Sequence, residues 1–83
     1  MRSVLYFSTQ TCTPCKMFKP LVQSTALELG INVNYIDAQQ NPSMAQAHSV
    51  TSVPTIVVME NGITVNKAVG AMSKPQLINL LKG

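Results

Sequence analysis

The apolar residues of the first third of the chain follow two different spacings. Residues 3–7 contain a continuous apolar run, partly β-branched or aromatic, which predicts a short buried strand. The next apolar residues recur every three or four positions, as on one face of a helix; they are Cys15, Phe18, Val22, Ala26 and Leu29. Gly30 is well placed to end this helix. Pro20 lies inside it, and we expect a kink there and not a break.

The middle of the chain predicts a second strand and a short helix. Residues 31–37 alternate apolar side chains with two asparagines, the pattern of a strand with one buried face. A strand, a helix and a strand in this order form a β-α-β unit, so the two strands should be parallel. Asn41 followed by proline is typical of an N-cap, and it predicts a helix that runs to about His48.

The last third of the chain predicts a hairpin and a helix. Residues 55–60 and 63–67 flank Asn61-Gly62, a pair that tolerates the two positive φ angles of a type I′ turn. Ser73 has a glutamine three residues later, which matches a capping box and predicts a helix over 74–82. The order β-α-β-α-β-β-α fits an α/β fold with a four-stranded mixed sheet and helices on both faces.

Composition favours one compact domain over residues 1–83. Only 11% of the residues are charged, against 46% hydrophobic. The formal charge of +3 comes from scattered basic residues, which indicates a mild preference for acidic partners and no nucleic-acid footprint. No apolar stretch reaches the length of a signal-peptide core or a membrane span, so we expect a soluble cytoplasmic protein without a membrane partner.

The only two cysteines, Cys12 and Cys15, lie between the end of the first predicted strand and the start of the first predicted helix. The first turn of a helix offers unpaired N–H groups and the positive end of the macrodipole, and both favour a thiolate. In a reducing compartment such a pair is typical of working thiols. The alternatives are inert core cysteines or half a zinc site, to which only His48 could add an imidazole. His48 could otherwise cap the short helix, lie in solvent or shuttle a proton.

The order of these motifs resembles the thioredoxin family over nearly the whole chain. The run from Cys12 to Lys16, with Pro20 beyond it, is similar to the family's Cys-Gly-Pro-Cys-Lys run and its kinking proline. The other matching segments, in the family's order, are Asp37, Asn41-Pro42, Val53-Pro54-Thr55, Asn61-Gly62 and Val69-Gly70-Ala71. The resemblance implies a thioredoxin fold and a dithiol oxidoreductase that reduces protein disulfides and is recycled by thioredoxin reductase.

The resemblance also implies roles for individual residues. Cys12 would be the nucleophile that forms a mixed disulfide, and Cys15, more buried, would resolve it to leave a Cys12–Cys15 disulfide. No bound cofactor or metal is implied, and we expect a monomer. Pro54 would be cis, and the backbone of Val53 would pair with an extended substrate. The implied substrate-binding residues are Thr11, Thr13, Pro14, Val53, Pro54, Gly70 and Ala71.

The chain departs from the family at three places. It lacks the first strand and helix of full-length thioredoxins and is about the size of a glutaredoxin. Thr11 stands where the family usually has tryptophan, and Tyr6 stands where it has a buried aspartate. Cys15 therefore has no evident acid-base partner, and water or the Tyr6 hydroxyl are hypotheses for that role. Lys16 is a further candidate for tuning the thiolate of Cys12.

Two other functions remain open from the sequence. A glutaredoxin-like protein recycled by glutathione usually has Pro-Tyr between the cysteines and a Gly-Gly-Asp segment after the last strand; here these positions hold Thr13-Pro14 and Gly70-Ala71-Met72. An interaction subunit could instead use the apolar groove of the fold without any turnover.

Overall fold

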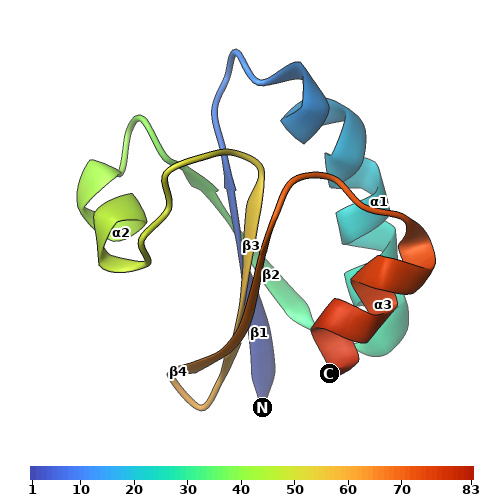
Figure 1. Ribbon diagram of the computed structural model, residues 1–83. Helices are drawn as coiled ribbons and strands as arrows, with labels where there is room; N and C mark the ends of the chain where they lie inside the picture. The colour runs from blue at the N-terminus through green and yellow to red at the C-terminus, as the bar shows by residue number, and fades with distance from the viewer.

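A computed structural model describes all residues from Met1 to Gly83 and shows a four-stranded sheet with three helices (Figure 1). The elements in chain order are β1 (Arg2–Ser8), α1 (Thr13–Leu29), β2 (Asn32–Asp37), α2 (Pro42–Ala47), β3 (Thr55–Glu60), β4 (Ile63–Val69) and α3 (Lys74–Lys82). The strand order is β2-β1-β3-β4; β1 and β2 are parallel, and β3 is antiparallel to both β1 and β4. The predicted mixed α/β sheet is therefore confirmed.

The helices cover both faces of the sheet, with α1 and α3 on one side and α2 on the other (Figure 1). β1 is central and contributes alternate side chains to two core clusters: Val4 and Tyr6 pack toward α1 and α3, whereas Leu5 and Phe7 pack toward α2. This two-sided burial explains why its apolar run is continuous. None of the three helices combines the length and the apolar character that a membrane-spanning helix needs.

The predicted turns and helix ends are mostly confirmed. α1 continues through Pro20 and ends at Gly30, whose φ of 68° is left-handed. Asn61 and Gly62 both have positive φ, and they join β3 to β4 as the type I′ prediction requires. The capping box at the start of α3 is present, with both of its hydrogen bonds made.

One local prediction is confirmed in position only, and another was wrong. Asn41 is the N-cap residue of α2 and proline follows it, as predicted, but its side chain makes no capping hydrogen bond; its Nδ2 instead donates to the carbonyl oxygen of Asp37 at 3.1 Å. Tyr35 was expected on the buried face of its strand, yet it is 41% exposed. The reason is that β2 is an edge strand. Its side chains have a neighbouring strand, β1, on one side only, and solvent reaches them from the other side.

Candidate active site

Cys12 and Cys15 form a disulfide at the start of α1, with their Cα atoms 5.3 Å apart. Cys12 is the N-cap residue and is half-buried, whereas Cys15 lies in the first turn and is only 2% exposed. The backbone N–H of Cys15 donates to Cys12 Sγ at 3.1 Å. An unpaired donor of the helix N-terminus is thus aimed at the more accessible sulfur, which is the arrangement that stabilises a thiolate after reduction.

The immediate surroundings of Cys12 carry no negative charge in the first turn of α1. Lys16 is exposed one turn along, and its backbone N–H donates to the carbonyl oxygen of Cys12 at 3.2 Å. Thr11, Thr13 and Pro14 are exposed around the disulfide, where a substrate chain can reach them. The predicted contact residues on this side therefore share one accessible surface with Cys12.

Tyr6 lies fully buried on β1, beneath the first turn of α1. Its hydroxyl donates to the carbonyl oxygen of Cys15 at 2.7 Å, so the hydrogen bond reaches the backbone of the cysteine and not its sulfur. Burial, with a smaller contribution from the neighbouring Tyr35, raises the pKa of Tyr6 to about 12. The hydroxyl keeps its proton at neutral pH, and this geometry supports positioning of Cys15 rather than proton transfer to it.

The loop before β3 and the end of β4 meet at the predicted proline. The Val53–Pro54 peptide bond is cis, as the resemblance implied, and the backbone N–H of Gly70 donates to the carbonyl oxygen of Pro54 at 2.8 Å. A Cβ at position 70 would meet no atom of the chain within 4 Å, so packing within the domain does not require a glycine there. The residue is instead explained by its φ of 93°, which L side chains rarely adopt. Ala71 follows and is exposed.

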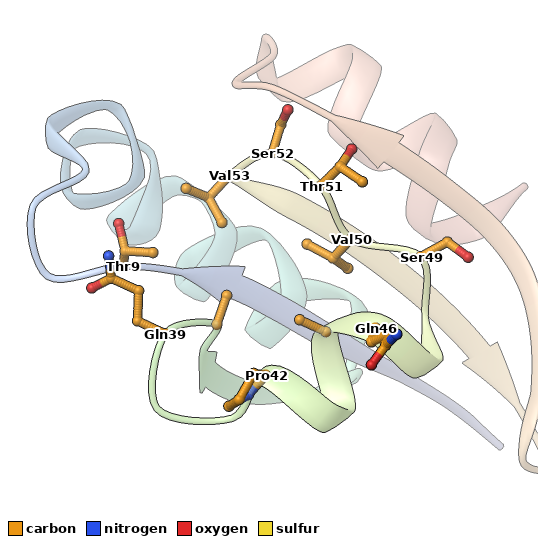
Figure 2. Close-up of a pocket in the computed structure, with 11 residues that line it drawn as sticks. Thr9, Gln39, Pro42, Gln46, Ser49, Val50, Thr51, Ser52 and Val53 are labelled. Atoms are coloured by element: carbon orange, nitrogen blue, oxygen red, sulfur yellow. The ribbon is translucent and has the colours of Figure 1, made fainter.

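A pocket of ≈ 600 Å³ opens between α2 and the loop that leads to Val53 (Figure 2). Its lining residues are Thr9, Ala38, Gln39, Pro42, Ala45, Gln46, Ser49, Val50, Thr51, Ser52 and Val53, none of which is charged. The backbone N–H of Cys12 donates to the carbonyl oxygen of Thr9 at 3.3 Å, so the Thr9 end of the pocket lies next to the N-cap residue of α1. Of these residues only Val53 was predicted from the sequence; the small polar residues Ser49, Thr51 and Ser52 on either side of Val50 were the available signal.

The residues considered for other chemistry lie apart from the cysteines. His48 is the C-cap residue of α2, which is one of the roles considered for it from the sequence. Its ring centroid is 5.8 Å from that of Phe7. No group of three or more His, Cys, Asp or Glu side chains comes together anywhere in the chain, so the zinc alternative lacks a ligand set. The redox group of the site is the Cys12–Cys15 disulfide itself.

Comparisons with known proteins agree with this geometry. The thioredoxin family model matches residues 1–83. The chain is 37% identical to a thioredoxin of Mycoplasma genitalium over 81 residues (93% of this chain, 76% of the relative) and 34% identical to one of Chlamydia trachomatis over 76 residues (90% and 74%).

Solved structures are similar over almost the whole chain. A mutant thioredoxin from Halobacterium salinarum superposes with a TM-score of 0.92 at 31% identity, covering 98% of this chain and 72% of that one. Oxidised mitochondrial thioredoxin 3 from Saccharomyces cerevisiae gives 0.89 at 27% identity, covering 98% and 76%. With its dithiol at the strand-to-helix junction, the chain belongs to the thioredoxin family and is a thiol–disulfide oxidoreductase.

Proposed function

We propose that this single domain, residues 1–83, reduces disulfides in other proteins and is returned to the dithiol by a thioredoxin reductase, acting as a cytoplasmic monomer. The observation that carries the proposal is the hydrogen bond from Cys15 N–H to Cys12 Sγ at a half-buried N-cap, beside a buried second sulfur. This asymmetry suits one accessible nucleophile and one protected resolving thiol.

The proposed reaction moves two electrons in two steps. The Cys12 thiolate attacks one sulfur of the substrate disulfide, forms a mixed disulfide and releases the other substrate sulfur as a thiolate, which takes up a proton. Cys15 then gives up its proton and attacks Cys12 Sγ. The Cys12–Cys15 bond forms, the mixed disulfide breaks and the second substrate thiol leaves. The substrate is reduced and the domain is oxidised.

Two features favour a reductase over glutathione as the electron donor. Glutathione carries two carboxylates and an ammonium group, but no charged side chain lines the pocket beside the disulfide. The segment after β4 reads Gly70-Ala71-Met72 and offers no carboxylate to anchor the ammonium. A charged tripeptide seated in this pocket would lose hydration without gaining a charged partner from the pocket walls.

The test is turnover of a protein disulfide with thioredoxin reductase and NADPH in one reaction, and with glutathione, its reductase and NADPH in another. We expect turnover in the first, and none with the Cys12→Ser variant. Faster turnover in the second would favour the glutaredoxin-like alternative. Absence of turnover in both, together with full biological activity of Cys12→Ser, would point to an interaction subunit.

A further inference from the structure

Two of the six basic side chains form salt bridges with acidic side chains, and four do not. Arg2 pairs with Glu60 at 3.6 Å and Lys74 with Glu28 at 3.0 Å. Both pairs lie at the end of the molecule opposite Cys12, because Arg2 begins β1 and Glu28 is in the last turn of α1. The basic residues without an acidic partner are Lys16, Lys19, Lys67 and Lys82.

Two of these free cations share the helix face of Cys12. Lys16 and Lys19 follow Cys12 by four and seven residues, which places all three on one side of α1. Lys19 Nζ lies 4.7 Å from the ring centroid of Tyr35, a contact that holds the ammonium in place and leaves its charge intact. Two positive charges without an acidic partner therefore lie on the side of α1 that carries Cys12.

The opposite side of the disulfide is uncharged. The pocket lies with α2 on the other face of the sheet from α1, and its walls consist of hydroxyls, amides and small apolar groups (Figure 2). The backbone N–H and C=O groups of Thr51 and Val53 bond to no other group of the protein, so they remain available to a polypeptide. Lys67 reaches this region, but its ammonium is occupied by the carbonyl oxygens of His48 and Ser49, each at 2.9 Å.

We propose that the pocket and the lysine-bearing surface of α1 select residues of different charge before and after the substrate cysteine in its sequence. Uncharged residues enter the pocket, and carboxylates lie beside Lys16 and Lys19. This inference rests on the proposed function and narrows its substrate class: protein disulfides in which acidic residues flank the attacked cysteine on one side in sequence and uncharged polar residues flank it on the other.

The test uses three peptides, each with one cysteine in a mixed disulfide with coloured thionitrobenzoate. One peptide has two aspartates before the cysteine and serine and glutamine after it, the second reverses this order, and the third is neutral. Attack of Cys12 on the peptide sulfur releases the coloured thiolate, which gives the second-order rate constant. At low ionic strength, only one of the two acidic peptides should react faster than the neutral peptide, by about threefold to fivefold. The acidic peptide with the opposite order should react no faster than the neutral peptide.

Variants assign the preference to the two sides. The double variant Lys16→Gln, Lys19→Gln should bring the ratio of acidic to neutral rates to about one, whereas Lys82→Gln, at the far end of the molecule, should leave it unchanged. Gln46→Lys places a cation in the pocket wall. It should raise the rate constant of the acidic peptide that reacts no faster than the neutral one with the wild-type protein.

Equal acceleration of both acidic peptides would overturn the inference, because net charge alone would then explain it. A ratio that survives in the double lysine variant would overturn it as well. In either case reduction of the neutral peptide would leave the proposed function standing. If wild-type protein reduced none of the peptides and no protein disulfide, the proposed function would fail together with the inference.

Discussion

Replacing Tyr6 with phenylalanine removes one buried hydroxyl and keeps the ring that packs in the core. The lost hydrogen bond to the Cys15 carbonyl is short, at 2.7 Å, and no solvent reaches the tyrosine to replace it. A buried hydrogen bond contributes about 1 kcal/mol net, and an acceptor left short of a partner costs somewhat more, so we expect a loss of about 1–2 kcal/mol in the free energy of unfolding at pH 7. For a domain of this size the melting temperature should fall by about 4–8 °C per kcal/mol.

The same variant has a signature at alkaline pH. The pKa of Tyr6 is raised from 10.0 to about 12, so folding favours the protonated phenol. The resulting stabilisation is complete below pH 10 and is lost as the pH rises from 10 to 12, with an upper limit of about 3 kcal/mol for a pKa raised by about two pH units. The phenylalanine variant lacks this contribution. The difference in stability between wild type and variant should therefore be the same at pH 7 and 9 and smaller at pH 11.

Urea unfolding of the oxidised protein at these three pH values measures both effects. Tyr35→Phe is the matched control, because Tyr35 is 41% exposed and belongs to the same aromatic cluster. If Tyr6→Phe were as stable as wild type at pH 7, or if the difference stayed constant up to pH 11, the hydrogen bond to Cys15 would not have the strength that its geometry indicates.

Three further changes test other parts of the structure. Gly70→Ala forces a side chain into a φ of 93° and should cost about 1–3 kcal/mol, read from the melting temperature. Lys67→Met removes the ammonium group that donates hydrogen bonds to the carbonyl oxygens of His48 and Ser49. Amide hydrogen exchange in the loop of residues 49–53 should become faster, while the free energy of unfolding changes by less than about 1 kcal/mol. Ser73→Ala removes the capping box of α3 and should cost about 1 kcal/mol by urea unfolding; an unchanged midpoint would show that the cap is dispensable.

Features encoded by a few adjacent residues could be predicted from the sequence. The turn at Asn61-Gly62 and the left-handed end of α1 at Gly30 depend on local backbone freedom, and the capping box depends on residues within one helical turn. The position of both cysteines at one helix start could also be predicted locally, whereas their disulfide was implied by the family resemblance. The cis state of Pro54 required the family resemblance, because an ordinary X-Pro bond is rarely cis.

Features that depend on distant neighbours could not be predicted in this way. The exposure of Tyr35 follows from the place of β2 at the sheet edge, which no local pattern specifies. The partner of the Tyr6 hydroxyl depends on how α1 crosses β1, and the pocket exists only because the 49–53 loop packs beside α2. Asn41 illustrates a competition between two acceptable roles: its amide bonds to the Asp37 carbonyl instead of capping the helix.

Capture of the reaction intermediate tests the central claim, the division of roles between the two cysteines, most directly. The Cys15→Ser variant, reduced and mixed with a protein disulfide, should accumulate a mixed disulfide through Cys12 that intact-mass spectrometry detects, because the resolving thiol is absent. The Cys12→Ser variant should accumulate little, since Cys15 is 2% exposed. Equal trapping by both variants, or trapping through Cys15 alone, would contradict the account.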